Sequence, residues 1–445
     1  VEFVVEDGRF EEILPADSAT ADGDEQWVNL DGGLVLPGAI DGHVHFDDPG
    51  FTHREDFASG TSAAAAGGVT CVVDMPCTSL PPVTDTDALE NKLKIIAPKA
   101  HVDYMLWGGV SGNLMTDSRW RKKLSDLVDA GVAAIKIYML SGMDTFRDLT
   151  SGEIQDVLEQ THRLGIPVGV HAEDSSIVDE LTRRAAERGD DSPRAYAASR
   201  PPAAEASAVL AAIEACRATG ARVHIVHLAA GEALDAVSAA RFENLPISAE
   251  TCPHYLEFTI QDFERLGSVL KTAPVVKSEV DRERLWQGLV SGEISFVATD
   301  HAAGRWPEEK ETGSIWTDYG GVPGVELMLP YLYSQGFSTG RITLQRLTEL
   351  VSSEPARFFG IDHRKGFLRP GYDADFVVFD ESDRWTVRAS TLHNLNRYTP
   401  LEGRELTGRV RATYVRGQNA FERRLDDSEF FAPAGTGEWV RRGLA

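Results

Sequence analysis

Two histidines separated by one residue, His43 and His45, are the side chains whose spacing best suits metal chemistry. They follow the apolar run 34–40, which is typical of a buried strand. Side chains two residues apart on a strand point to the same face, so both imidazoles can bind one metal ion. Because a His-x-His pair is also common in ordinary half-buried strands, a metal site requires further ligands elsewhere in the chain.

Three further candidate ligands follow short apolar runs of the kind that form buried strands: His171, His227 and Asp300. Stretches with helical character separate these runs: 151–164, 203–219 and 278–289. Alternating strands and helices predict a parallel α/β fold. In an eight-stranded barrel of this class the carboxyl ends of all strands meet at one mouth, so distant ligands can bind one metal centre. Histidines packed in a large core explain one or two of these positions but not the whole set.

The length of the chain, 445 residues, exceeds that of an ordinary barrel and indicates a smaller second module. Short strand-like pieces lie near both ends, for example at 3–5 and 376–379. These pieces predict a small β domain that is built from both termini and lies beside the barrel.

The composition excludes several classes of partner. A net charge of −25 argues against nucleic acid or an anionic membrane, because phosphate binding needs a basic surface. No apolar run is long enough to span a membrane, and no basic and apolar leader precedes the first strand. The four cysteines show no paired spacing, which fits free thiols in a reducing compartment. We therefore expect a soluble, cytoplasmic protein.

Six motifs are informative as a set: Pro37-Gly38-x-Ile40-Asp41-x-His43-Val44-His45, Ala63-Ala64-Ala65-Ala66-Gly67-Gly68-Val69-Thr70, Asp74-Met75-Pro76, His171-Ala172-Glu173, Thr251-Cys252-Pro253-His254-Tyr255-Leu256 and Thr299-Asp300-His301. Together they resemble the cyclic amidohydrolases, the group of the amidohydrolase superfamily that contains dihydroorotases, allantoinases, hydantoinases and dihydropyrimidinases. The resemblance runs from about residue 1 to 420. It implies a metal-dependent (β/α)8 TIM barrel with a small β-sandwich domain built from both termini.

The resemblance also divides the chain into segments. The expected segments are 1–34 for the N-terminal part of the β-sandwich domain, 35–365 for the barrel, 366–425 for the C-terminal part of the β-sandwich domain and 426–445 for a loosely structured tail.

The resemblance gives Lys136 a role that its spacing alone does not indicate. Many of these enzymes carry, at this position, a lysine carboxylated by CO2 that bridges two metal ions. Carbamylation turns a cation that would repel a divalent metal into a carboxylate-like bridge, whereas without the resemblance Lys136 is better explained as a lysine at a strand end. Two divalent ions, for which we expect zinc, would be held by His43, His45, Lys136, His171, His227 and Asp300. Asp300 would also be catalytic, taking a proton from the attacking water and returning it to the ring nitrogen.

Departures from the subfamily patterns bear on the substrate. Dihydroorotases commonly bind a substrate carboxylate through three positions that are Asp47, Cys77 and Gly304 in this chain. A carboxylate at Asp47 would repel an anionic substrate, at a cost of roughly 4 kcal/mol for charges about 4 Å apart at an effective dielectric near 20, unless Arg54 or Arg305 compensates.

Other departures point to allantoinases and L-hydantoinases. The stretch 271–274 resembles the Lys-x-Ala-Pro motif of these two groups. Its Ala273 stands where dihydroorotases tend to have asparagine. Ser141 stands where D-hydantoinases and dihydropyrimidinases usually have a tyrosine. Two segments, 50–57 and 321–326, remain similar to dihydroorotases.

We therefore expect a hydrolase that opens a neutral cyclic ureide, allantoin or a hydantoin, to a ureido or N-carbamoyl acid. Its expected substrate contacts are Asp47, Cys77, Ala273 and Gly304, although Asp47 is equally explained as a turn residue before Pro49. A dihydroorotase is the alternative activity, and a metal-free scaffold homologue is the alternative of another class. Because relatives are often dimers or tetramers, we expect a homo-oligomer.

Three polar residues beside the candidate ligands are expected to have lesser roles. His224 is expected to face the helix layer, and Glu173 to begin the following helix. His301 is expected at most to support the metal ligands from behind.

Overall fold

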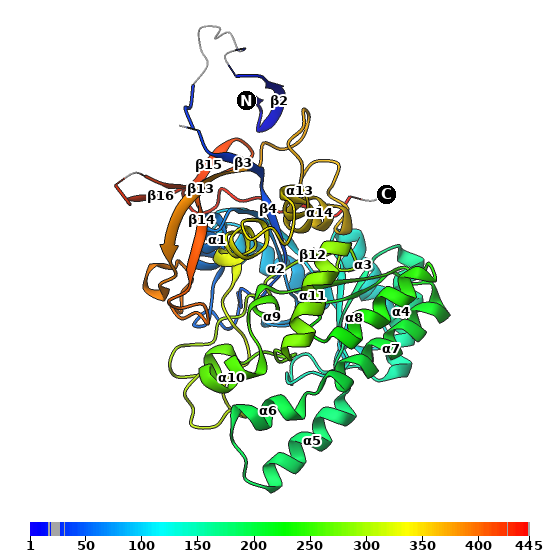
Figure 1. Ribbon diagram of the computed structural model, residues 1–445. Helices are drawn as coiled ribbons and strands as arrows, with labels where there is room; N and C mark the ends of the chain where they lie inside the picture. The colour runs from blue at the N-terminus through cyan, green and yellow to red at the C-terminus, as the bar shows by residue number, and fades with distance from the viewer. Residues whose placement is uncertain (17, 19–26, 31, 425, 444–445) are drawn as a thin grey trace.

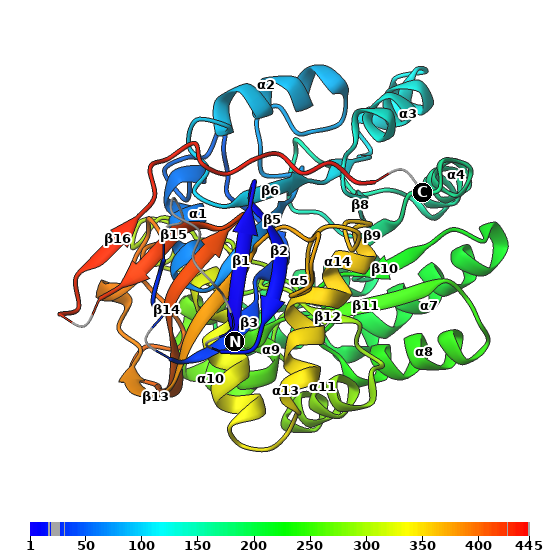
Figure 2. The same ribbon diagram turned by 90° about the horizontal axis from the view of Figure 1, so that it is seen from above.

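The computed structural model describes residues 1–16, 18, 27–30, 32–424 and 426–443. Its parallel strands form two sheets, ordered β12-β11-β10-β9-β8-β7 and β4-β5-β6. The sheets join because one residue separates β6 from β7, and because Val44 at the end of β4 bridges to His301 beyond β12. With β6 and β7 counted as one bent strand, eight parallel strands close a barrel at the centre of Figure 2, which confirms the (β/α)8 prediction.

The barrel strands are short. They are β4 (Ala39–Val44), β5 (Val69–Asp74), β6 (Asp103–Leu106), β7 (Gly108–Gly109), β8 (Ile135–Tyr138), β9 (Val168–His171), β10 (Val223–Ile225), β11 (Ile247–Thr251) and β12 (Phe296–Val297). The carboxyl ends of β8 and β9 are level, since Tyr138 at the end of β8 lies opposite His171 at the end of β9.

Helices surround the barrel, as Figure 2 shows for α2, α3, α4, α7, α8 and α11. The helices are α1 (Phe57–Ala66), α2 (Thr86–Ile96), α3 (Trp120–Ala130), α4 (Ser151–Leu164), α5 (Ser175–Glu187), α6 (Pro193–Ser199), α7 (Pro202–Thr219), α8 (Gly231–Phe242), α9 (Pro253–Glu257), α10 (Ile260–Leu266), α11 (Glu279–Ser291), α12 (Met328–Tyr331), α13 (Leu344–Thr348) and α14 (Glu354–Phe358). Local signals explain the boundaries: Thr150 and Glu153 form a capping box at the start of α4, and Gly165 ends it with φ 66°. Across the described ranges, no helix has both the length and the apolar character needed to cross a membrane.

Buried side chains fill the inside of the barrel below its mouth. They include Ile40, Met105, Trp107 and Phe296, all fully buried. The indole Nε1 of Trp107 donates a hydrogen bond to the Gly42 carbonyl oxygen at 3.0 Å. The interior is therefore a packed floor, and polar side chains have room only at the carboxyl ends of the strands.

The two termini form an antiparallel domain beside the barrel (Figure 1). Its five-stranded sheet has the order β16-β15-β14-β13-β3, formed by β3 (Leu34–Pro37), β13 (Phe376–Thr386), β14 (Glu405–Val415), β15 (Gln418–Arg423) and β16 (Glu429–Phe431). The hairpin of β1 (Glu2–Glu6) and β2 (Arg9–Leu14) packs on this sheet through Phe10, which clusters with Phe376 and Tyr414. A barrel with a β-sandwich built from both termini is thus confirmed, although β3 includes residues that the sequence placed in the barrel.

The segment expected to be a loose tail makes ordered contacts where it is described. Strand β16 extends the antiparallel sheet, and Trp439 bridges to Tyr104 in β6. Farther on, the Arg442 side chain donates hydrogen bonds to the carbonyl oxygens of Ala133 and Phe358. The segment therefore packs along the barrel, as the red trace in Figure 2 shows.

Candidate metal centre

Five of the six predicted ligands lie at or just beyond the carboxyl ends of barrel strands: His43, His45, His171, His227 and Asp300. The sixth, Lys136, is the second residue of β8. Ring contacts join the histidines, with 5.3 Å between the ring centroids of His43 and His45 and 4.7 Å between those of His171 and His227. The centroids of His43 and His227 lie 5.3 Å apart and connect the two pairs. The fold therefore gathers residues from distant parts of the sequence at one place.

The first group of donor atoms consists of His43, His45 and Asp300. One oxygen of Asp300, Oδ1, lies 3.1 Å from Nε2 of His43 and 3.2 Å from Nε2 of His45. The three side chains can together hold a metal ion. Burial opposes ionisation of Asp300, but the neighbouring His43 and His45 hold its pKa well below its usual range, so the group is a carboxylate.

The second group consists of His171 and His227. Nδ1 of His171 faces Nε2 of His227 at 3.0 Å. Two metal–nitrogen bonds of about 2.0–2.1 Å can span this separation. Burial, the largest cause, keeps the pKa of both imidazoles below the ordinary value, which favours the neutral form that binds metal.

The charge of Lys136 interacts with both groups, with Asp300 of the first and with His227 of the second. Its side chain is fully buried, and its Nζ has no hydrogen-bond partner among the described residues. Burial lowers the pKa of Lys136 to about 8. Near pH 8 this buried amine is therefore partly neutral.

Glu250, on β11, holds two histidines and was not predicted as part of the site. One oxygen lies 2.6 Å from Nδ1 of His43, and the other lies 3.2 Å from Nε2 of His224. The expectation for His224 was therefore wrong, because its imidazole faces Glu250 rather than the helix layer. One feature of the sequence could have revealed Glu250. It is a carboxylate within a buried strand, where an unpaired charge is costly and a partner is therefore expected.

Glu173 plays a similar part for His171. Its Oε2 lies 2.9 Å from Nε2 of His171 and accepts a 2.6 Å hydrogen bond from Arg200. Helix α5 begins after Asp174, whose side chain caps it, so the expectation that Glu173 only begins the helix was wrong. Arg200 and Glu173 together orient His171 with Nδ1 toward His227.

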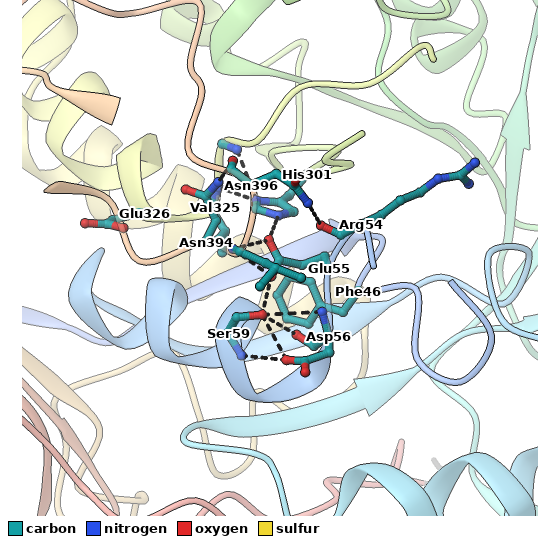
Figure 3. A network of polar contacts seen from close by, with 12 residues as sticks. Phe46, Arg54, Glu55, Asp56, Ser59, His301, Val325, Glu326, Asn394 and Asn396 are labelled. Atoms are coloured by element: carbon teal, nitrogen blue, oxygen red, sulfur yellow. Dashed lines mark hydrogen bonds and ion pairs between the residues drawn. The ribbon is translucent and has the colours of Figure 1, made fainter. Parts of the chain in front are cut away.

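His301 anchors the backbone next to Asp300 (Figure 3). Its Nδ1 accepts hydrogen bonds from the backbone N–H groups of Gly324 and Val325, and its Nε2 faces Glu55 at 3.3 Å. Glu55 also accepts a hydrogen bond from the Leu395 N–H at 3.1 Å. The network joins the turn after β12 to the segment between β4 and α1 and to the loop between β13 and β14.

Three residues at the mouth adopt left-handed backbone conformations: Asp47 (φ 50°), His227 (φ 41°) and Asp300 (φ 50°). Residues other than glycine rarely adopt these angles, and such strain concentrates at functional sites. Each of these residues lies two or three positions beyond the end of its barrel strand.

The expected substrate contacts differ in their surroundings. Asp47 is fully buried, and burial raises its pKa to about 8. The Sγ atom of Cys77 lies 3.1 Å from the Tyr138 hydroxyl oxygen and 3.7 Å from Nδ1 of His45. Cys77 therefore adjoins His45, whereas Asp47 is linked to His45 by an electrostatic interaction.

Gly304 and Ala273 have neighbours other than the histidines. The Gly304 N–H donates to the Tyr398 hydroxyl at 2.9 Å, and a Cβ atom at this position would lie 2.7 Å from the Tyr319 ring. A larger side chain at Gly304 would therefore displace Tyr319. Ala273 is half-buried, and no polar contact joins it to the histidines in the part of the chain that the structure describes.

Comparison with known proteins places this geometry in a family. Residues 34–420 match the amidohydrolase family. The chain belongs to that family. An allantoinase of Rubrobacter xylanophilus is 38% identical over 90% of this chain and 87% of its own length. An L-hydantoinase of Paenarthrobacter aurescens is 32% identical over 99% of this chain and 94% of its own length.

A solved structure gives the same result for the fold. The L-hydantoinase (dihydropyrimidinase) from Arthrobacter aurescens has a TM-score of 0.92 at 31% identity, covering 99% of this chain and 95% of that protein. Membership of the amidohydrolase family confirms the resemblance found in the sequence. The family is metal-dependent, and the group of His43, His45 and Asp300 fits that property.

A second acidic group in this amidohydrolase, Asp103, Asp373 and Asp375, has the spacing of a metal site. The ammonium group of Lys365 already lies among them, 2.7 Å from Asp103 and 2.6 Å from Asp375. The cluster is therefore an ion-pair network, at the opposite end of the barrel strands from the histidines.

Proposed function

We propose that this chain is a metal-dependent hydrolase that opens the ring amide bond of a neutral cyclic ureide, allantoin or a substituted hydantoin. The product is a ureido or N-carbamoyl acid. Relatives named allantoinase and L-hydantoinase, at 38% and 32% identity over most of the chain, support this class of reaction.

The observation that carries the proposal is the arrangement of donors about Lys136. Two groups of donor atoms, one on His43, His45 and Asp300 and one on His171 and His227, accompany a buried amine without a partner among the described residues. We propose that these residues hold two zinc ions and that a CO2-derived carbamate on Lys136 bridges them. When bound, such ions lower the pKa of a water molecule and polarise the ring carbonyl.

Asp300 is the proposed proton carrier. Its ionised Oδ1 can accept the proton that the attacking water loses as its oxygen bonds to the ring carbonyl carbon. The same oxygen can then give that proton to the ring nitrogen as the carbon–nitrogen bond breaks. The nitrogen leaves as a neutral N–H group instead of a strongly basic anion.

The surroundings of Asp47 support a neutral substrate. Arg54, which could have offset its charge, makes a bidentate ion pair with Glu309 at 2.7–3.0 Å. Arg305 pairs with Glu308 at the surface. Since both arginines are paired with glutamates, neither is free to bind the carboxylate of dihydroorotate.

A substrate panel tests this proposal. Purified protein loaded with zinc and bicarbonate is assayed with allantoin, hydantoin, dihydrouracil and dihydroorotate. We expect kcat/KM for allantoin or hydantoin to exceed that for dihydroorotate by at least about tenfold, because the dihydroorotate carboxylate lacks a cationic partner. Turnover of dihydroorotate far above both ureides would overturn the substrate assignment. No turnover of any ring, with no bound metal, would favour the scaffold alternative.

Several expectations remain proposals beside the activity. They are the identity of the metal as zinc, the homo-oligomeric state as a dimer or tetramer, the cytoplasmic location, the absence of nucleic-acid and membrane partners, the substrate contacts of Cys77, Ala273 and Gly304, and the boundaries of the domains.

A further inference from the structure

We propose that Glu205, on helix α7, is a positioning residue for His227: it holds the backbone turn after β10 and thereby directs the His227 imidazole toward His171. This role rests on the proposed function, because it presupposes a metal ion at the second group of donors. It adds to the centre a carboxylate that lies outside both groups of donor atoms.

The imidazole of His227 is held differently from those of His43 and His171. Each of these two rings has a glutamate at its second nitrogen, at 2.6 Å for His43 and 2.9 Å for His171. Nδ1 of His227 has no hydrogen-bond partner among the described residues. Its backbone also adopts a left-handed conformation, with φ 41°, which the surroundings must maintain. The direction of this ring therefore depends on the turn that carries it.

Hydrogen bonds hold this turn at successive backbone N–H groups. The His227 N–H donates to Oε1 of Glu250 at 3.3 Å, and the N–H of the next residue donates to the Glu250 carbonyl oxygen at 2.9 Å. The N–H groups of Ala229 and Ala230 donate to Oε1 of Glu205, at 2.7 and 3.0 Å. Glu250 thus holds the first half of the turn, and Glu205 holds the second half.

Glu205 reaches the turn from a neighbouring helix. It lies in the first turn of α7, which packs beside α8 (Figure 2). Ala230, the residue before α8, has no side chain that could cap that helix, so an acceptor from elsewhere is needed. Burial raises the pKa of Glu205, whereas Lys277 and the two N–H groups lower it. Because Glu205 is buried, loss of its oxygen would leave two buried N–H groups without an acceptor.

Lys277 connects this support to the support of His171. Its ammonium group lies 3.7 Å from Oε2 of Glu205 and donates a hydrogen bond to the Arg200 carbonyl oxygen at 2.8 Å. The Arg200 guanidinium in turn holds Glu173, the carboxylate behind His171. One chain of contacts therefore supports both histidines of the second group, whose facing nitrogens lie 3.0 Å apart.

Two roles for Glu205 can be separated by substitution. One role is to accept the two N–H groups, and the other is to neutralise Lys277. Glu205→Asp keeps a carboxylate but is shorter by one methylene group, so it cannot reach both N–H groups at their present positions. Glu205→Gln keeps the length and one acceptor oxygen but removes the charge.

The test measures both zinc dissociation constants of each protein in competition with a chelator. We expect Glu205→Asp to weaken one of the two constants by about 10–100-fold, the range for residues that orient a metal ligand from behind, and Glu205→Gln to stay close to wild type. In a His227→Ala background, which lacks the positioned ligand, Glu205→Asp should have no further effect.

A matched control shortens another buried glutamate. Glu326 accepts a hydrogen bond from the His393 N–H at 2.8 Å, and His393 is not one of the six ligands. Glu326→Asp should leave both zinc constants unchanged. A loss equal to that of Glu205→Asp would show that the effect does not pass through the His227 turn.

Two further results would overturn the inference. One is unchanged zinc binding in Glu205→Asp. The other is a loss in Glu205→Gln as large as that in Glu205→Asp, which would assign Glu205 to the charge of Lys277; this arm decides alone if Glu205→Asp does not fold. Either result leaves the proposed function intact when wild type binds two zinc ions and hydrolyses cyclic ureides. Wild type without stoichiometric zinc would contradict the proposed function itself.

Discussion

At the residue scale, a carboxylate holds the second ring nitrogen of two histidines of the centre, His43 and His171. Glu250 holds Nδ1 of His43 and leaves Nε2 toward Asp300. Glu173 holds Nε2 of His171 and leaves Nδ1 toward His227. A carboxylate at one nitrogen fixes the tautomer and presents the lone pair of the other to a metal.

Substitution of Glu250 tests this arrangement. Glu250→Gln should weaken zinc binding by about 10–100-fold, because the amide no longer fixes the orientation and basicity of His43. The measurement is the zinc dissociation constant of the apo-protein in competition with a chelator.

A control exists in a second, partly buried carboxylate–histidine pair. Glu326 lies 3.0 Å from Nδ1 of His393 and accepts a hydrogen bond from the His393 N–H, so its carboxylate holds a histidine that is not one of the six ligands. Glu326→Gln should leave the zinc affinity unchanged. An unchanged affinity in Glu250→Gln, or an equal loss in both variants, would contradict the role given to Glu250.

Five of the six ligands could be predicted from the sequence because each lies at or near the carboxyl end of an apolar strand, whereas Lys136 could be predicted only from the resemblance to the family. His43, His171 and His227 are of this kind. The carboxylates behind them could not be predicted, because their contacts depend on the register between strands. Glu250 reaches His43 across 207 positions of sequence, and no local pattern encodes that separation.

At the element scale, segments beyond the strands form one side of the mouth. Arg54, in the segment after β4, makes its bidentate ion pair with Glu309 in the segment after β12. Asn396 donates hydrogen bonds to the carbonyl oxygens of His53 and Arg54. The site therefore depends on three segments held together by charged and polar contacts.

Prediction of the elements succeeded where local signals are strong. The helix expected at 151–164 has the same boundaries in the structure, because capping residues mark both ends. The apolar run 34–40 was assigned almost wholly to the barrel, but it contains two strands divided at Gly38. Both strands are apolar, so hydrophobicity does not separate them. Gly38 is required because a Cβ atom would overlap the Thr70 side chain.

At the scale of the whole molecule, a buried ion-pair network joins the two domains. Lys365 is almost fully buried and lies within 3.0 Å of Asp103, Asp373 and Asp375. Asp103 begins barrel strand β6, whereas the other two aspartates precede β13 of the antiparallel sheet. The lysine therefore links the amino-terminal end of the barrel to the β-sandwich domain.

Removal of this lysine should destabilise the protein. Lys365→Met would leave three buried carboxylates without their shared cation, and we expect a loss of about 3–5 kcal/mol in the free energy of unfolding. The measurement is urea denaturation at neutral pH. Lys123→Met is the control, since Lys123 pairs with Asp85 and Asp117 near the surface and should cost at most about 1 kcal/mol. Equal losses in both variants would show that the buried network is not a link of this kind.

The central proposal is a two-metal centre bridged by a carbamate on Lys136, and metal analysis tests it most directly. Wild type and Lys136→Met are purified from zinc-supplied cultures, and bound metal is quantified per chain by mass spectrometry. We expect two divalent ions per chain in wild type and the loss of at least one in the variant, because the shared ligand is gone. Wild-type protein without stoichiometric metal, or a variant that keeps both ions, would contradict the proposed centre.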